Sequence, residues 1–323
     1  MIYKHATFAA CMALAFACPL NAQTVATPAK LEMHGLVQVW ATGEDTSSTF
    51  RIRRTELKLQ GTFTDKLRWQ VQVDPVRTTG ILQDAMLTYL LRNNLAVDVG
   101  QFKVPLTREG TMSSSMLETA ERALFGSAPN KLADLRDIGA QIRYTAPWSM
   151  DVRAGVFNSL GGNDNAADRD DRKGLMGQIT AAPAFLRGII LTTSGGVSVG
   201  SSDTLPSSNR ISAGGAYAGH GLTLRSEYLQ GEEAGTDRVG YYGLAAYRIH
   251  PRVEFVTRYD VWNPDTDRVT SAVSLRETDY TGGITYFIDS HLAKLQVNYM
   301  RKTFENTALS ARNVVIVNAQ AAW

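Results

Sequence analysis

The chain has 323 residues, and 33 lysines and arginines nearly balance 31 aspartates and glutamates, which leaves a formal net charge of +2. This balance gives no global charge that would favour nucleic acid as a partner. After the first segment no stretch of about 18 residues is apolar enough for a membrane-spanning helix, so the sequence excludes helical spans.

Residues 1–22 have the features of a secretory signal peptide. An apolar run of small residues, 6–17, follows a short polar start, and small residues precede a cleavage site before Gln23. A lipoprotein signal at Cys18 is the alternative, but the usual leucine three residues before that cysteine is absent. We therefore expect an exported mature chain of residues 23–323.

Few residues of the mature chain suit catalysis or metal binding. Both cysteines, Cys11 and Cys18, lie in the signal segment, which excludes disulfides, cysteine zinc sites and a cysteine nucleophile from the mature chain. The remaining histidines show neither metal-ligand spacing nor pairing with a serine: His34, His220, His250 and His291. The acidic stretch 163–171 could bind calcium, although a solvated loop is the simpler interpretation. We expect no enzyme activity, no cofactor and no metal.

The dominant signal is the alternation of polar and apolar residues. In 66–74 every odd position is apolar and every even position is polar, and the stretches 251–262 and 294–299 repeat this pattern. Successive side chains of a strand point to opposite faces, so each such segment has one apolar and one polar face. Sixteen segments of this kind predict strands at 31–42, 50–63, 66–74, 83–92, 95–103, 137–146, 148–158, 172–182, 185–194, 209–218, 221–230, 238–249, 251–263, 277–288, 291–302 and 313–323.

The connections between these segments alternate in length. Short ones are predicted near 64–65, 93–94, 146–147, 182–183, 219–220, 250 and 289–290. Long ones are predicted at 43–49, 75–82, 104–136, 159–171, 195–208, 231–237, 264–276 and 303–312. Short periplasmic turns and longer external loops are typical of transmembrane barrels. The pattern predicts an all-β fold, a transmembrane antiparallel β-barrel of about 16 strands, over the alternative of a soluble sandwich.

Aromatic residues lie near the ends of many predicted strands, where amphipathic rings suit the two membrane interfaces. They are Trp69, Tyr89, Tyr144, Trp148, Tyr228, Tyr247, Tyr286 and Tyr299. The last strand ends on Trp323, which is similar to the terminal aromatic assembly signal of outer-membrane barrels.

The longest connection, 104–136, is the third long loop of the predicted barrel. A loop of this length in a compact domain is usually functional or disordered. We expect it to fold into the lumen and to set the narrowest point of the pore.

The polar faces of the strands carry charges of both signs. The alternation places Arg54, Lys58, Arg68, Arg143, Arg153, Arg225, Arg258 and Lys294 inside, with Glu56, Asp74, Asp98, Asp151, Glu227, Glu254 and Asp260. Charged groups cannot face lipid cheaply, so a charged inner face predicts a hydrated lumen. A plugged barrel whose charges pair with one another is the alternative.

Part of the sequence resembles the phosphate-selective porins O and P. The resemblance rests on Phe50-Arg51-Ile52-Arg53-Arg54-Thr55-Glu56-Leu57 and Gly100-Gln101-Phe102-Lys103-Val104-Pro105-Leu106, followed by Ser113-Ser114-Ser115 and Ala120-Glu121-Arg122-Ala123-Leu124. Beyond residue 124 only the barrel pattern and the terminal aromatic match. The resemblance implies a sixteen-stranded trimer with an inward third loop and with arginines that guide anions.

The resemblance also indicates which residues line the pore. Arg53 and Arg54 match the paired arginines of the family's constriction, but strict alternation turns Arg53 outward. Both can serve only if a β-bulge lies there or if they lie above the membrane. The family's phosphate site uses a lysine of the third loop, and this chain has none between Lys103 and Lys131. The departure puts phosphate specificity in question. The predicted anion-lining residues are Arg53, Arg54, Lys58, Arg68, Lys103, Arg108 and Arg122.

We therefore expect an outer-membrane porin that passes small hydrophilic solutes with a mild preference for anions. The expected partners are small inorganic or organic anions, outer-membrane lipid and lipopolysaccharide, and two further copies in a homotrimer. A porin without this selectivity and a non-conducting adhesion or assembly barrel are the alternatives. A barrel lipase would require a serine–histidine pair, which the sequence does not offer.

Overall fold

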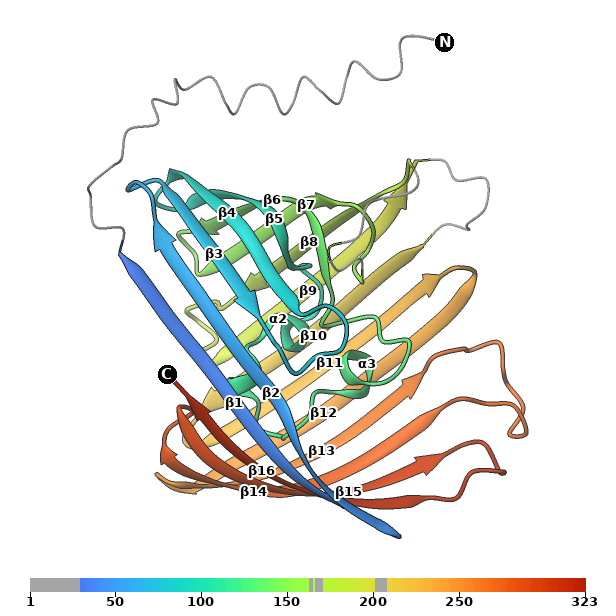
Figure 1. Cartoon of the computed structure of the whole chain (residues 1–323). Coiled ribbons are helices and arrows are strands. Elements are labelled where there is room, and N and C mark those ends of the chain that lie inside the picture. Colours follow the sequence, from blue (N-terminus) through green and yellow to red (C-terminus); the bar gives the residue numbers. More distant parts are fainter. Residues whose placement is uncertain (1–29, 163–164, 166–170, 201–207) are drawn as a thin grey trace. The chain divides into compact units, whose positions relative to one another are not determined.

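A closed barrel of sixteen antiparallel strands accounts for most of the described residues, which are 30–162, 165, 171–200 and 208–323 in this computed structural model. Each strand pairs with its neighbours in sequence, and β1 pairs with β16 to close the barrel (Figure 1). The strands are β1 (Leu31–Glu44), β2 (Ser47–Thr62), β3 (Leu67–Val73), β4 (Leu82–Arg92), β5 (Leu95–Lys103), β6 (Arg136–Ala146), β7 (Met150–Phe157), β8 (Lys173–Ala181), β9 (Ile189–Val199), β10 (Asn209–Gly219), β11 (Leu222–Glu233), β12 (Thr236–His250), β13 (Val253–Asn263), β14 (Glu277–Asp289), β15 (Ala293–Phe304) and β16 (Arg312–Ala322). The predicted all-β barrel of sixteen strands is confirmed.

Helix is confined, in the described part of the chain, to three short pieces of the loop between β5 and β6. They are α2 (Arg108–Thr111), η1 (Ser114–Met116) and α3 (Leu124–Ser127). None of the helices in the described ranges has the length and apolar character that crossing a membrane requires. The predicted signal peptide, 1–22, and most of the acidic stretch 163–171 lie outside the described residues.

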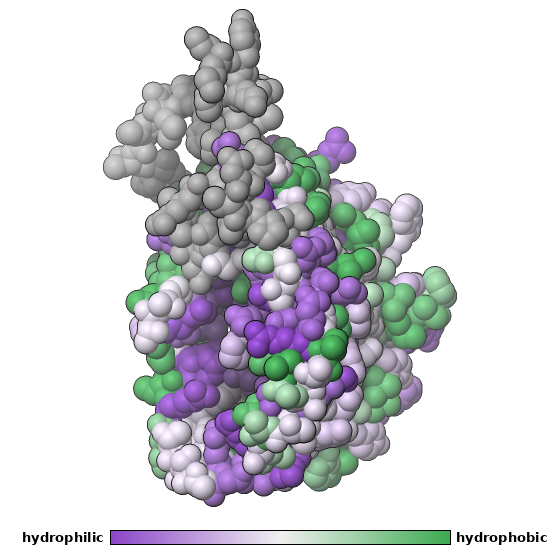
Figure 2. Space-filling model, turned by 90° about the vertical axis from the view of Figure 1, so that its right-hand side faces the viewer, coloured by the Kyte–Doolittle hydropathy of each residue, from purple (hydrophilic) through white to green (hydrophobic). Residues whose placement is uncertain are grey.

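The strands bury their polar side chains and expose their apolar ones, the reverse of what a water-soluble protein does. On β15 the polar Lys294, Gln296 and Asn298 are each 1% exposed, whereas Leu295 and Tyr299 between and beside them are 44% and 49% exposed. A solvated sheet hides its apolar side chains, so an outward apolar face indicates that the barrel is surrounded by lipid. Figure 2 shows hydrophobic residues along the outer edge and hydrophilic residues gathered around a hollow.

The aromatic residues predicted for the membrane interfaces are mostly on this outer face. Tyr89, Tyr144, Trp148, Tyr228, Tyr247, Tyr286 and Tyr299 are all exposed. Trp69 is partly buried, and its ring lies 6.3 Å from that of Phe63. Trp323 extends the pairing of β16 with β1 that closes the barrel, because its backbone exchanges two hydrogen bonds with Gly35 of β1, at 3.0 and 3.1 Å.

The predicted alternation of connection lengths is only partly right. The stretches 43–49 and 231–237 were expected to be long loops, but β1–β2 and β11–β12 stay paired to the tip, as in Glu44 opposite Ser47. The second of these turns needs two residues with positive φ, and Ala234 and Gly235 supply them at 54° and 77°.

The boundaries of β9 also differ from the prediction. The strand was expected at 185–194 after a short turn at Ala182 and Pro183, yet it begins at Ile189. Two successive turns occupy 183–188, closed by Leu186 N donating to Pro183 O and Ile189 N to Leu186 O, and Gly188 takes a φ of 79°. At its other end the strand runs through Gly195 and Gly196, which pair with β8 and β10 instead of forming a loop.

Candidate functional site in the barrel lumen

The loop between β5 and β6, residues 104–135, is held against one side of the lumen. We call this side, the inner faces of β8 to β16, the covered wall. Glu227 of β11 accepts hydrogen bonds from the backbone N–H groups of Arg108 and Glu109, at 2.6 and 2.8 Å. Further along the loop, Asn298 of β15 accepts from Ala120 N, at 2.6 Å. Asp260 of β13 accepts from Leu124 N at 2.8 Å. Together these four hydrogen bonds from its backbone fix the loop to the wall.

Donors of the same wall bind the carbonyl groups of the loop. Lys294 donates to Leu117 O at 2.7 Å, and Arg258 donates to Glu121 O at 2.8 Å. Arg225 of β11 forms an ion pair with the loop carboxylate Glu118. The covered wall therefore satisfies both the N–H and the C=O groups of a segment with little regular structure of its own.

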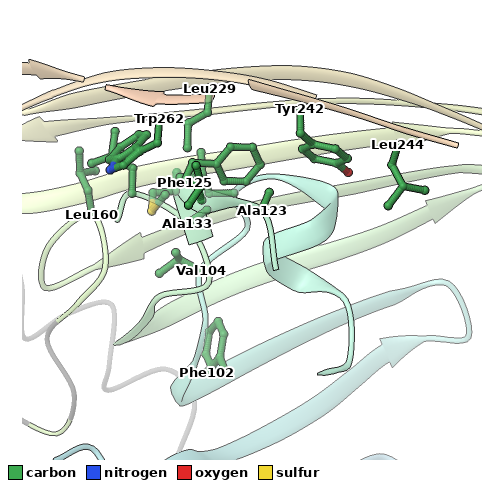
Figure 3. Packing of buried hydrophobic residues seen from close by; sticks show 14 of the residues in the cluster. Phe102, Val104, Ala123, Phe125, Ala133, Leu160, Leu229, Tyr242, Leu244 and Trp262 are labelled. Atoms are coloured by element: carbon green, nitrogen blue, oxygen red, sulfur yellow. The ribbon is translucent and has the colours of Figure 1, made fainter. Parts of the chain in front are cut away.

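Apolar packing completes the attachment of the loop. Phe125 of α3 is fully buried, and its ring lies 5.8 Å from that of Tyr242 on β12. Leu229 of β11 and Trp262 of β13 belong to the same cluster, as Figure 3 shows. Apolar side chains thus occur on the inward face of β11–β13, where the loop covers them.

Arg122 organises the loop from within. Its side chain is 1% exposed, and its guanidinium donates to the carbonyl groups of Glu109 and Met112. The Nε atom lies 3.4 Å from Asp134, the other end of the loop. Because its donors are engaged by the loop itself, Arg122 holds the loop together rather than facing the cavity described next.

A cavity of about 380 Å³ lies between the loop and β2 to β6, which we call the open wall. Among the residues that the structure describes, seven cationic and five anionic side chains line it, a formal sum of +2. The cations are Arg53, Arg54, Lys58, Arg77, Lys103, Lys131 and Arg136, and the anions are Glu56, Asp74, Asp84, Glu121 and Asp134. A polar, charged cavity of this kind is suited to hydrated ions.

Arg53 and Arg54 reach this cavity together because the pairing of β1 and β2 shifts at this point. Gln38 pairs with Arg54, while the next residue, Val39, pairs with Ile52, so Arg53 is the extra residue of a β-bulge. A bulge places two residues of one strand opposite one residue of its partner, which breaks the strict alternation. Both arginines contact Glu121 of the loop: Arg53 Nη2 lies 2.8 Å from Oε2, and Arg54 Nη2 lies 3.5 Å from Oε1.

The other cations of the cavity fall into two groups. In the first, the loop carboxylate Asp134 is 2.7 Å from Lys103 and 3.6 Å from Lys131, and Arg136 is 2.7 Å from Asp84 of β4. Burial alone would raise the pKa of Asp134, but the nearby cations outweigh it and hold the pKa well below its usual range. Asp134 therefore stays ionised.

The second group consists of Lys58 and Arg77, which form no ion pair with any residue of the described ranges. Within the described ranges, Arg77 donates to two neutral oxygens, Thr79 O and the side chain of Gln83. Lys58 lines the cavity, and no carboxylate of the described residues lies within ion-pair distance of it. Their charges are therefore not compensated by a carboxylate among the described residues.

Four of the seven predicted anion-lining residues line the cavity, namely Arg53, Arg54, Lys58 and Lys103. Arg68 is exposed on β3 outside it, and Arg108 and Arg122 belong to the loop's attachment and its interior. That the lining residues guide anions stays a prediction, as does the idea that the loop sets the narrowest point of the pore.

Sequence reasoning missed Arg77, Lys131 and Arg136 as lining cations and Glu121 as the partner of the arginine pair. Arg77 and Arg136 flank predicted strands, so a search of strand ends could have found them. The local sequence does not indicate that Glu121 contacts Arg53, because the two residues lie 68 positions apart in the chain.

Comparison with known proteins supplies the family. A model of the family described as phosphate-selective porin O and P matches residues 32–203, more than half of the chain. No curated protein matches the chain.

Several solved structures resemble the fold. An anion-selective porin from Comamonas acidovorans is 11% identical with a TM-score of 0.65, over 91% of this chain and 100% of that one. The outer-membrane channel DcaP of Acinetobacter baumannii is 13% identical with a TM-score of 0.65, over 91% and 97%. OmpT of Vibrio cholerae, described as a trimer form, is 14% identical with a TM-score of 0.63, over 91% and 99%. At these identities the likeness concerns the fold.

Proposed function

The chain belongs to the phosphate-selective porin O and P family and is an outer-membrane porin, and on that premise we propose that its water-filled channel passes small hydrophilic solutes with a weak preference for anions. The supporting observation is the charge of the cavity. Among the described residues seven cations face five carboxylates, and Lys58 and Arg77 have no carboxylate partner there. Positive charge between low-dielectric walls raises the local concentration of anions. The excess is small, so the preference is weak.

The preference is tested by the reversal potential of the purified protein in a planar bilayer under a KCl gradient. We expect a chloride-to-potassium permeability ratio moderately above unity. A strong cation preference would overturn the proposal. The same recording separates the alternatives, because an unselective porin gives a ratio near unity and a structural or adhesion barrel gives no steps of conductance.

Tight phosphate binding is not part of this proposal. Five carboxylates of the described residues line the cavity, where they engage several of its cations and repel a phosphate at close range. The expected result is that inorganic phosphate at micromolar concentration leaves the chloride current unchanged.

The remaining features of the proposal concern export and assembly. Residues 1–22 act as a signal peptide, and N-terminal sequencing of the mature protein should begin at Gln23. The barrel assembles as a homotrimer among outer-membrane lipid and lipopolysaccharide, in line with the trimer form described for OmpT of Vibrio cholerae. A monomeric mass in mild detergent would contradict the trimer. The family and the fold are those of a channel, and we assign no catalytic residue.

A further inference from the structure

Arg53 and Arg54 bind one carboxylate in the way that arginines bind a free oxyanion. Arg53 approaches Oε2 of Glu121 with Nη2 at 2.8 Å and with Nε at 3.2 Å, and Arg54 approaches Oε1 at 3.5 Å. Each oxygen of the carboxylate thus has its own guanidinium. Both donors of Arg53 contact the same oxygen, while Arg54 contributes an ion pair to the other. Guanidinium groups bind carboxylate and phosphate oxygens through such charge-assisted contacts.

Glu121 is held in this position by contacts of the loop with the covered wall. Its backbone carbonyl accepts hydrogen bonds from Arg258 on β13 and from the Thr119 hydroxyl, both at 2.8 Å. The preceding residue, Ala120, is bound to Asn298 of β15. Strands β13 and β15 are not neighbours of β2 in the barrel, so the loop spans the space between two walls at this point. A carboxylate fixed in this way competes with free anions at a high effective concentration.

Glu121 also remains charged. Burial alone would raise the pKa of Glu121, but Arg53 and Arg54 outweigh burial and lower the pKa to about 2. The arginine pair therefore has an anionic occupant throughout the neutral range.

We propose that Arg53 and Arg54 form an oxyanion-binding site whose tethered occupant is Glu121, and that Glu121 thereby limits the anion selectivity of the pore. This inference deepens the proposed anion preference and rests on it. The ligand class of the vacated site is a small oxyanion of the phosphate or carboxylate type. Loss of the Glu121 charge raises the formal sum over the described lining residues from +2 to +3. It frees Nε and Nη2 of Arg53 and Nη2 of Arg54, while Arg54 Nη1 stays bound to Gln38.

Glu118 provides a matched control on the same loop. It too is ion-paired with an arginine, Arg225 of the covered wall, and its side chain is 13% exposed against 17% for Glu121. Glu118 does not line the cavity. Glu118→Gln and Glu121→Gln therefore remove the same charge from the same loop, but only the second vacates the arginine pair.

The test records wild-type protein, Glu121→Gln and Glu118→Gln in planar bilayers. In Glu121→Gln we expect the chloride-to-potassium permeability ratio to rise about threefold. Inorganic phosphate should reduce its chloride current at a concentration that leaves the wild type and Glu118→Gln unaffected. Adding Arg53→Gln to Glu121→Gln should abolish the phosphate effect. Circular dichroism of each variant verifies the barrel, and Glu121→Ser serves if Glu121→Gln does not assemble.

Two results would overturn the inference. Equal changes in the two single variants would mean that Glu121 acts only through net charge. An unchanged permeability ratio in a folded Glu121→Gln variant would mean that the arginine pair does not contact the permeating ions. A cation-selective wild type would instead refute the proposed anion preference, and the difference between the two variants would still decide the role of Glu121.

Discussion

The covered wall and the open wall of the barrel carry similar charged residues but use them differently. On the covered wall, carboxylates such as Glu227 and Asp260 accept hydrogen bonds from the backbone of the loop and are nearly inaccessible. On the open wall, Lys58 and Arg77 line a cavity and have no carboxylate partner among the described residues. Inward charge in a porin therefore serves two purposes, to hold the loop and to face the solute.

The two walls differ because one is packed against the loop and the other is not. A loop buried in the lumen brings many backbone N–H and C=O groups that must be satisfied, and the covered wall supplies acceptors and donors for them. The open wall faces the water of the lumen, so the electric field of its charges extends into the lumen. Glu121 contacts both walls, the open wall through its carboxylate and the covered wall through its carbonyl oxygen.

Reversing the unpaired charges of the open wall should have the largest effect. Lys58→Glu with Arg77→Glu changes the formal sum of the cavity from +2 to −2, and we expect the pore to become cation-selective. The measurement is the sign of the reversal potential in a KCl gradient. Arg68→Glu is the control, because Arg68 lies on β3 outside the cavity and its reversal should leave the sign unchanged. A double variant that keeps the wild-type reversal potential would contradict the assignment.

Removing part of the loop should change conductance more than selectivity. Replacing residues 113–119 by two glycines takes away Leu117 and Glu118, which bind the covered wall, together with η1. We expect single-channel conductance to rise severalfold, because the loop occupies space in the lumen. Shortening the connection 305–311 between β15 and β16 should have little effect. Unchanged conductance with an intact barrel would show that the loop does not narrow the pore.

The barrel was predictable from the sequence because its signal is local and repeated. The alternation along each strand indicates directly which face meets lipid. Because the pattern recurs in sixteen strands, an error at the boundary of one strand does not change the predicted fold. The errors that occurred involve residues whose local pattern is ambiguous. Gly195 and Gly196 suggested a loop but form part of β9, and Phe185 and Leu186 suggested a strand but lie in turns.

The site was less predictable because it depends on contacts between distant segments. The inward position of Arg53 depends on a β-bulge. The alternation pattern showed that a bulge was one way to bring Arg53 inward, but it could not show that one is present. One useful signal was overlooked, namely apolar residues at inward positions. Leu229, Tyr242 and Trp262 share the inward face with charged residues, and they mark where the loop packs. Such breaks in alternation indicate a covered wall, whereas uninterrupted polar positions, as in Arg54-x-Glu56-x-Lys58, indicate an open one.

Weakening one anchor of the covered wall should have a moderate effect. Glu227 accepts from Arg108 N, Glu109 N and the Tyr242 hydroxyl, and Glu227→Gln would place an NH₂ group against one of these donors. The cost is about 1–3 kcal/mol for an unsatisfied buried group. We expect more frequent fluctuations of the open-channel current with little change in the permeability ratio. Glu254→Gln is the control, since Glu254 pairs with Arg248 and makes no hydrogen bond with the described loop residues. Equal noise in both variants would argue against an anchoring role.

The smallest effect is expected from pH, and it tests whether Glu121 stays bound to the arginine pair. A carboxylate whose pKa is depressed keeps its ion pair above its ordinary pKa and loses it as the pH falls through the depressed value. With Glu121 at about 2 against an ordinary 4.5, the pair should persist at every pH above about 5. The charged groups around Glu121 that enter this balance are Arg51, Arg53, Arg54, Arg122 and Lys131. All of them are cations that remain protonated as the pH falls from neutral. We therefore expect the difference in reversal potential between wild type and Glu121→Gln to stay constant from about pH 8 to about pH 5. Titratable groups elsewhere in the protein are common to both variants and cancel in the difference. A difference that shrinks steadily across this range would show that Glu121 takes up a proton there, and the arginine pair would then be free for solute anions at mildly acid pH.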